Sequence, residues 1–438
     1  MFKPASMETL LSQSVGDLLD AGNPDLLDRW SPVSDWMETR LSRGLDASCK
    51  STAARVGPRV VGRDRAGRGI AGINLAMQDA LSLASHPAIL TAVSAAGRRF
   101  GVHAAGSAAQ MGLSTLTTTL EERLAMFLGC DEAVVFPCGW TAGYGTLRTL
   151  LRAGDHALVI GHPRECLREG AASSGARVQM LDHGDAEGLE QRLEWLRDTD
   201  PHAGILVVVP ALSLHEQSLP DLPRLQRLCR RYAATLLVDV SHDLGMTGET
   251  GRGVLEMQRM IGRVDIVLGS FSRAFASNGG FVASRHAALK VALRLHCAAQ
   301  FDSNAMSPLQ AAAALAALDV IASDEGAERR DRLAANARRL RDGLEAAGLA
   351  TLGQPGPVVT VALPRVDVAR QLTAELLAQG ALVNLDERPG FEGAVWPLKP
   401  MADHEATDID TFLQTLRAAR LGLIEAEERH WLDRYASA

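Results

Sequence analysis

Two apolar runs of strand length, 236–240 and 264–268, end in small and polar residues. The polar side chains near these ends are Asp239, His242, Ser270, Ser272 and Arg273. Runs of this kind predict buried parallel strands that open onto a ligand crevice at their C-terminal ends. A carboxylate, an imidazole and hydroxyls gathered there could hold a charged ligand and move a proton.

His242 and Arg273 suggest different chemistry. An imidazole with an ordinary pKa of about 6.5 can act as a general base near neutral pH, but His242 could equally be a structural histidine. Arg273 stays protonated and cannot act as a nucleophile. Because an unpaired buried carboxylate costs several kcal/mol, Asp239 needs a partner, and we expect the Arg273 guanidinium to reach it.

A second candidate site follows the short predicted strand 134–136. The next residues, PCGWTAGYGTLRTLL (137–151), predict a helix whose first turn holds Cys138, Gly139 and Trp140. Free backbone N–H groups and the helix dipole favour a phosphate at such a helix start. Cys138 could have a lowered pKa and act as an acyl nucleophile, although a small buried residue is the favoured interpretation.

Composition limits the classes of function. The chain has 438 residues, 47% of them hydrophobic, which is enough for a large core and for more than one typical domain. Its formal charge of −7 argues against a nucleic-acid partner. The six cysteines show no metal-ligand spacing and predict reduced thiols. Without a signal-like N-terminus or an apolar stretch of roughly 20 residues, we expect a cytoplasmic protein with no membrane segment and no metal.

Several segments together resemble a known family. The region 236–280, QDALSLASHP (78–87) and FDSNAMSPLQAAAAL (301–315) resemble the α-oxoamine synthases, acyltransferases that depend on pyridoxal phosphate (PLP). This resemblance implies PLP fold-type I, an α/β fold with a mostly parallel large-domain sheet and a smaller C-terminal α/β domain. It implies a helical arm (1–70), a large domain (71–290), a small domain (291–438), and a homodimer with sites at its interface.

The resemblance also assigns roles. Asp239 would hold the pyridine nitrogen, with His242 three residues later. Cys138, Gly139, Trp140 and Ser270 would bind the cofactor, and Asn304 takes the place of a threonine that reaches the neighbouring subunit's phosphate. The ring-stacking position falls on His162 or Arg164.

The sequence departs from the family at the residue that matters most. Arg273 stands at the position of the cofactor-binding lysine, and an arginine cannot form the internal aldimine. Ala80 and Pro210 replace a usual tyrosine and glutamate. In that family an amino acid is joined to an acyl-thioester with loss of carbon dioxide. Losses at several positions around one site indicate that this protein has abandoned that reaction.

Three hypotheses follow. In the first, which we favour, the protein transfers an acyl group from acyl-CoA or an acyl-carrier protein to an amine or another nucleophile, without a lysine–PLP aldimine. His242 would be the base, with Arg273 and Ser270 beside it. In the second, the chain is a non-catalytic partner of an active PLP-dependent homologue. In the third, PLP binds non-covalently and supports altered chemistry.

Overall fold

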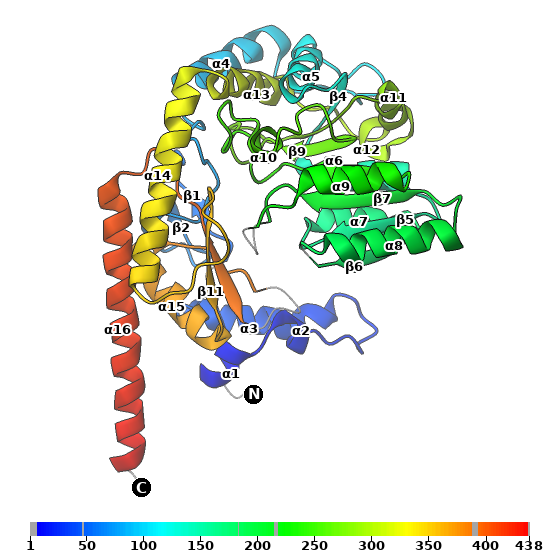
Figure 1. Ribbon diagram of the computed structural model, residues 1–438. Helices are drawn as coiled ribbons and strands as arrows, with labels where there is room; N and C mark the ends of the chain where they lie inside the picture. Colours follow the sequence, from blue (N-terminus) through cyan, green and yellow to red (C-terminus); the bar gives the residue numbers. More distant parts are fainter. Residues whose placement is uncertain (1–6, 46–47, 183, 214–217, 388–392, 437–438) are drawn as a thin grey trace. The chain divides into compact units, whose positions relative to one another are not determined.

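A mixed seven-stranded sheet lies at the centre of residues 78–334, in the strand order β4-β10-β9-β8-β7-β5-β6 (Figure 1). Its strands are β4 Glu132–Phe136, β5 His156–Ile160, β6 Arg177–Leu181, β7 Ile205–Pro210, β8 Thr235–Asp239, β9 Ile266–Ser270 and β10 Gly280–Ser284. Strands β5, β6, β7, β8 and β9 are parallel, and β10 is antiparallel to both β9 and β4. The computed structural model describes residues 7–45, 48–182, 184–213, 218–387 and 393–436.

The two predicted strands after which the polar residues gather are confirmed as β8 and β9. All five residues of β9 are buried, as expected for a strand inside a covered sheet. This strand ends two residues later than predicted, because Gly269 and Ser270 continue the pairing with β10 opposite Phe281 and Gly280. A Cβ at position 269 would lie 2.3 Å from the Phe281 ring, so glycine lets that ring cross the strand.

Ten helices surround this sheet in the described part of residues 78–334. They are α4 Pro87–Phe100, α5 Thr115–Leu128, α6 Gly139–Leu150, α7 Glu165–Ser173, α8 Ala186–Thr199, α9 Leu222–Arg231, α10 Gly253–Met257, α11 Ala287–His296, α12 Ala298–Phe301 and α13 Pro308–Ile321. One buried core cluster joins the strands of the sheet to α6, α7 and α11. Gly143 brings α6 close to α7, since a Cβ there would lie 2.6 Å from Cys166 Sγ.

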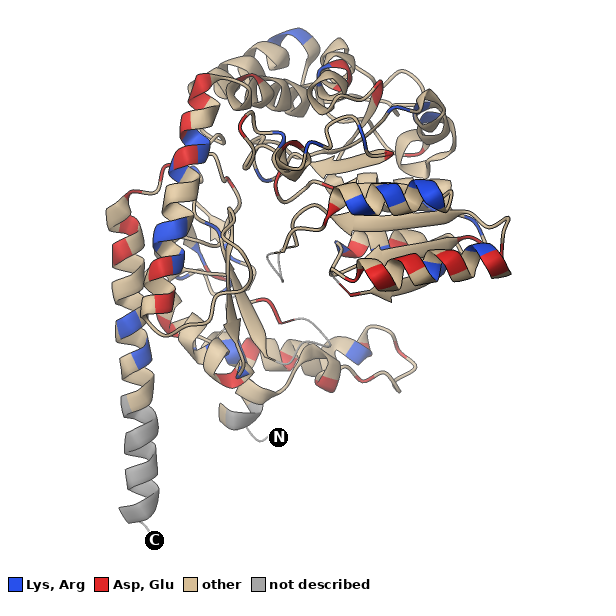
Figure 2. Cartoon of the chain, in the orientation of Figure 1, with Lys and Arg blue, Asp and Glu red and all other residues tan. Residues whose placement is uncertain are grey.

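Helix α9 shows why these helices form where they do. It buries Leu222, Leu225 and Leu228 and exposes Arg227 and Arg230, the pattern of an amphipathic helix against a sheet. Figure 2 colours acidic and basic residues along α8 and α9, whereas the neighbouring strand β7 contains no charged residue. The sheet is therefore apolar at its centre, and polar chemistry is confined to the strand ends and loops.

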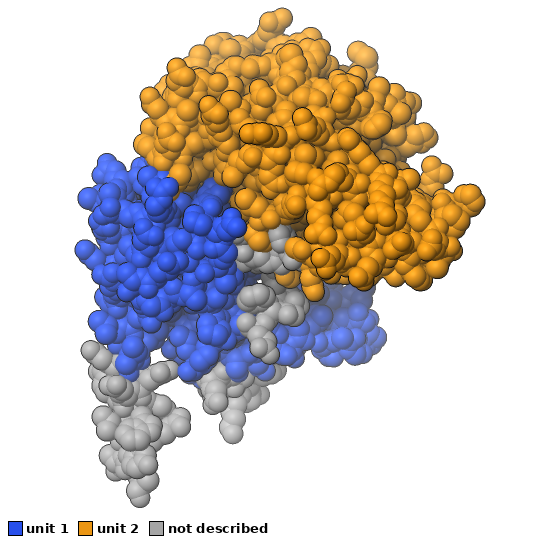
Figure 3. Space-filling model, in the orientation of Figure 1, with its two compact units in different colours: residues 1–77, 335–438 blue, residues 78–334 orange. Residues whose placement is uncertain are grey.

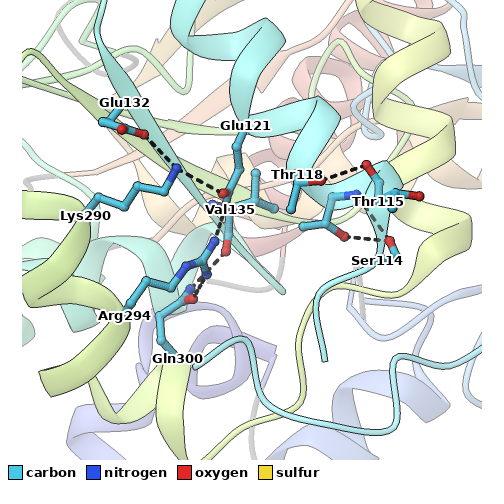
Figure 4. Close-up of polar contacts among 10 residues, drawn as sticks. Ser114, Thr115, Thr118, Glu121, Glu132, Val135, Lys290, Arg294 and Gln300 are labelled. Carbon is cyan, nitrogen blue, oxygen red and sulfur yellow. Dashed lines mark hydrogen bonds and ion pairs between the residues drawn. The ribbon is translucent and has the colours of Figure 1, made fainter. Parts of the chain in front are cut away.

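One buried charge cluster ties α5 to the sheet edge (Figure 4). The Glu121 side chain, only 3% exposed, accepts a hydrogen bond from the Val135 backbone N–H at 2.8 Å. Arg294 of α11 pairs with the same carboxylate, and Lys290 Nζ lies 3.6 Å from it. Gln300 donates to the Val135 carbonyl at 2.9 Å. Each of these polar groups has a partner inside the cluster, which marks it as structural.

Residues 1–77 and 335–438 form a second compact unit, coloured separately in Figure 3. Its strands are β1 Ser51–Thr52, β2 Arg59–Arg63, β3 Gly69–Asn74 and β12 Ala381–Leu382 in one sheet, and β11 Val359–Leu363 and β13 Ala394–Leu398 in another. Its helices are α1 Met7–Ser12, α2 Val15–Leu18, η1 Asp28–Trp30, α3 Ser31–Ser42, α15 Val366–Ala378 and α16 Ala406–Ala436, and α14 Asp324–Ala346 continues into it from residues 78–334.

The start of the chain is held in this second unit by a buried arginine. Arg370 of α15 donates to the carbonyls of Leu11 and Gln13 at 2.6 and 2.7 Å and pairs with Glu387. The Trp36 ring lies under the Arg370 guanidinium. The two ends of the chain therefore share one unit. Among the helices in the described residues, none combines the length and the apolar character that a membrane crossing requires.

Candidate active site

The C-terminal ends of four strands meet at one edge of the seven-stranded sheet. Strand β4 runs in the same direction as β9, because both are antiparallel to β10. The side chains brought to this edge are Cys138 after β4, Arg164 after β5, Asp239 and His242 after β8, and Ser270 and Arg273 after β9. We call these six residues the strand-end cluster. Of the polar residues predicted to follow the two strands, Arg273 contacts His242, and Ser270 contacts Ser272.

Asp239, the last residue of β8, is almost fully buried at 1% exposure and pairs with Arg164. The Arg164 Nε lies 2.6 Å from Asp239 Oδ2, and Arg164 Nη1 donates to the Gly139 carbonyl at 3.1 Å. The Ser241 backbone N–H donates to Asp239 Oδ1 at 3.0 Å. Burial opposes the charge of Arg164, but the Asp239 carboxylate outweighs it, so the pKa of the guanidinium is raised. This pair holds two charges away from water.

The expectation that Arg273 is the direct partner of Asp239 was wrong. The Arg273 guanidinium instead donates to His242 Nε2, at 3.2 Å from Nη2, and to the Gln78 side-chain oxygen. Burial, together with the nearby positive charge of Arg164, lowers the pKa of Arg273 to about 10. Arg273 therefore still carries its charge at neutral pH, and Asp239 acts on it only at longer range.

The hydrogen bond from Arg273 fixes the tautomer of the His242 ring. Since a guanidinium has only donors, Nε2 of His242 accepts the hydrogen bond from Arg273, which puts the ring proton on Nδ1. His242 Nε2 can take a proton from a substrate only if the substrate's N–H or O–H group replaces the Arg273 N–H as its hydrogen-bond donor. The base and the cation are thus adjacent, and the cation controls access to the base.

Ser270 and the start of α6 meet closely. A Cβ at position 139 would lie 2.8 Å from the Ser270 Oγ and 3.2 Å from Arg164 Nη1, so only glycine fits there. Ser270 Oγ lies 2.6 Å from Ser272 Oγ. Cys138 caps α6, its sulfur accepting from the Thr141 N–H at 3.5 Å, which accounts for a small polar side chain at this position.

Two of the predicted cofactor ligands lie at the surface. Trp140 is 48% exposed, although it belongs to the first turn of α6. Asn304 is exposed and forms a short β-bridge with Ser107. His162, one of the two candidates for ring stacking, is also exposed, whereas Arg164 is drawn into the strand-end cluster.

A second buried carboxylate, Asp243, lies in the loop after β8. It is 0% exposed, and its Oδ2 accepts from the Val254 N–H at 2.7 Å. Burial, reinforced by the negative charge of Asp239, raises the pKa of Asp243 to about 8. Asp243 is therefore mostly protonated at neutral pH and adds little negative charge to this edge.

The raised pKa of Asp243 predicts a stability loss with rising pH. Between its unfolded value of 3.8 and about 8, the folded state binds more protons than the unfolded state, so stability falls as pH rises through this window. From about pH 6 to about pH 8, the wild type should lose roughly 2 kcal/mol more than Asp243→Asn, which keeps the acceptor for Val254. Urea unfolding at both pH values measures the difference, and equal losses in the two proteins would contradict the assignment.

No lysine belongs to the strand-end cluster. The chain has four lysines, Lys3, Lys50, Lys290 and Lys399. Lys3 lies outside the described residues, and Lys50 precedes β1. Lys290 of α11 pairs with Glu132 at 2.7 Å, and Lys399 donates to the Ala76 carbonyl within residues 1–77 and 335–438.

Comparison with known proteins places the chain in a family. Residues 70–412 match the family model "Aminotransferase class I and II". The chain is 32% identical to 8-amino-7-oxononanoate synthase of Geobacter sulfurreducens, covering 87% of this chain and 95% of that relative. It is 33% identical to serine palmitoyltransferase of Caulobacter vibrioides, covering 78% of this chain and 84% of the relative.

Solved structures agree with this assignment. Serine palmitoyltransferase from S. paucimobilis with a bound PLP–myriocin aldimine superposes with a TM-score of 0.83 at 26% identity, covering 90% of this chain and 98% of that one. Serine palmitoyltransferase of Sphingomonas wittichii gives the same TM-score, identity and coverage. The predicted α/β fold of PLP fold-type I is confirmed. The chain belongs to the aminotransferase class I and II family and, within it, to the α-oxoamine synthases.

Proposed function

We propose that this α-oxoamine synthase relative transfers an acyl group from a thioester, acyl-CoA or an acyl-carrier protein, to an amine or another nucleophile without a lysine–PLP aldimine. Family membership supports the acyltransferase class. The observation that carries the rest is the Arg164–Asp239 ion pair, because it occupies the carboxylate that the family resemblance assigns to the pyridine nitrogen.

The residues at the strand ends do not fit PLP held as a lysine aldimine. Both oxygens of Asp239 already accept hydrogen bonds, one from Arg164 and one from the Ser241 N–H. No described lysine follows β5, β8 or β9. Non-covalent PLP would also have to break the buried Arg164–Asp239 pair before Asp239 could bind the pyridine nitrogen. We therefore derive the reaction from the protein's own side chains.

His242 and Arg273 can perform thioester transfer together. The acceptor's N–H or O–H replaces the Arg273 donor at His242 Nε2, and the imidazole takes the proton as the acceptor attacks the thioester carbonyl carbon. The released Arg273 guanidinium stabilises the negative charge on the carbonyl oxygen. The carbon–sulfur bond then breaks, and the thiolate takes the proton from His242. In this mechanism Ser270 binds and orients the reacting groups.

The test is thiol release from a series of acyl-CoA thioesters with the purified protein and an added amine. His242→Gln should lower kcat by about 10²–10⁴-fold, the usual contribution of a general base. His286→Gln, which changes an exposed histidine at the start of α11, serves as the matched control and should behave as wild type. Turnover that appears only after PLP is added, or that survives His242→Gln, would contradict the proposal.

A second candidate role, that of a non-catalytic partner subunit, has support from one observation. The polar side chains at the strand ends pair with one another: Arg164 with Asp239, Arg273 with His242, and Ser272 with Ser270. A subunit without chemistry of its own needs only such internal pairing. This role predicts no turnover by the isolated chain and stable co-purification with a lysine-bearing member of the family.

A further inference from the structure

The strand-end cluster carries more positive than negative charge. Arg164 and Arg273 are both protonated at neutral pH, and Asp239 is the one carboxylate among the six residues of the cluster. Asp243 is mostly protonated, and His242 is neutral because its Nε2 accepts from Arg273. The cluster therefore holds a net charge of about one positive unit at a largely buried place.

Two buried N–H donors of the same guanidinia lack partners. Arg164 Nη2 and Arg273 Nε are shielded from solvent and make no hydrogen bond within the described residues. Their other nitrogens are held, Arg164 by Asp239 and the Gly139 carbonyl, and Arg273 by His242 and Gln78. Buried donors without acceptors are uncommon in folded proteins, and charged ones cost more than neutral ones.

The two guanidinia also repel each other. The charge of Arg164 contributes to the lowered pKa of Arg273, second only to burial. The start of α6 adds further positive potential, because the N–H groups of its first turn have no partners inside the helix and Arg164 binds the carbonyl of its first residue, Gly139. A bound anion would relieve the repulsion and satisfy both donors.

We propose that Arg164 and Arg273 form a binding site for a carboxylate, donating to it from Arg164 Nη2 and Arg273 Nε. Its identification as the carboxylate of the acceptor substrate rests on the proposed function. A carboxylate has one negative charge, which matches the excess charge of the cluster, and two oxygens, which match the two donors. Bound beside His242, it would bring a neighbouring amine or hydroxyl of the same molecule toward the Nε2 lone pair.

The test uses acetate, inorganic phosphate and chloride as probes, compared by calorimetry and thermal unfolding at constant ionic strength. Acetate should raise the Tm above its value in chloride, in proportion to binding. Arg273→Gln should weaken acetate binding by about tenfold or more, since it removes the charge and one donor. The matched control is Arg285→Gln, which removes a charge from an exposed arginine and should leave the acetate affinity unchanged.

If Arg273→Gln does not fold, the Arg273→Lys variant tests the carboxylate site instead. Lysine keeps the charge but has no Nε–H, so acetate binding should weaken several-fold relative to Arg285→Lys. Equal effects of acetate and chloride, or equal acetate affinity in the variant and its control, overturn the site. Tighter binding of phosphate than of acetate overturns the carboxylate assignment. Acetate binding by a protein without acyl transfer leaves the site standing and contradicts only the proposed function.

Discussion

An Arg164→Ala/Arg273→Lys double variant is expected to bind PLP covalently and turn yellow, whereas Arg273→Lys alone should bind it at least about a hundredfold more weakly. In the single variant, the cofactor must first break the buried Arg164–Asp239 pair, which costs roughly 3–5 kcal/mol. Each 1.4 kcal/mol corresponds to a factor of ten in affinity. The double variant frees Asp239 for the pyridine nitrogen and supplies the amine.

Visible absorbance during PLP titration gives the affinity, and borohydride reduction followed by peptide mass analysis locates the bond at position 273. The single variant Arg164→Ala is the control without an amine, and should show no reducible adduct at that position. We expect no family condensation activity in the double variant, because Ala80 and Pro210 still depart from the family pattern. Equal PLP affinity in Arg273→Lys and the double variant would show that the ion pair is no obstacle.

Glu121→Ala is expected to lower the free energy of unfolding by roughly 3–5 kcal/mol. The change leaves the Arg294 guanidinium, 12% exposed, without its carboxylate, and it removes the acceptor of the Val135 N–H (Figure 4). Lys290 would keep Glu132 as a partner. The loss therefore comes mainly from one buried cation and one buried backbone donor, and urea unfolding measures it.

Two further variants identify the cause of that loss. Glu122→Ala removes a carboxylate from the exposed neighbour on α5 and should stay within about 0.5 kcal/mol of wild type. The double change Glu121→Leu/Arg294→Met replaces the buried pair by apolar side chains and should recover much of the stability. If the double change is as unstable as Glu121→Ala, the cost comes from the loss of the Val135 acceptor or from packing.

The Glu121 cluster and the strand-end cluster differ in how completely their charges and hydrogen-bond donors are paired. In the Glu121 cluster, every charge named has an opposite charge beside it, and the hydrogen bonds close within the cluster. In the strand-end cluster, two cations stand against one carboxylate, which pairs with Arg164 alone, and both cations keep donors without acceptors. An incomplete set of partners at the end of parallel strands is what a ligand site requires.

The amino-acid sequence by itself determined the fold class and most of the strand-end cluster. Apolar runs bounded by polar residues locate β8 and β9, because strands covered on both faces must be continuously apolar. Parallel strands end at a common edge, so Asp239, His242 and Arg273 could be grouped without coordinates. The absence of a lysine near these strand ends is likewise a property of the sequence.

Only the tertiary structure determined which charged side chains form ion pairs with one another. Arg164 lies four residues after β5, in a segment with no hydrophobic period to fix its direction, and its reach to Asp239 depends on how that segment turns at the sheet edge. The same holds for the grouping of residues 1–77 with 335–438 into one unit, which the order of the chain does not reveal. Burial follows patterns that recur along the sequence, whereas an ion pair depends on a single distance between segments far apart in the chain.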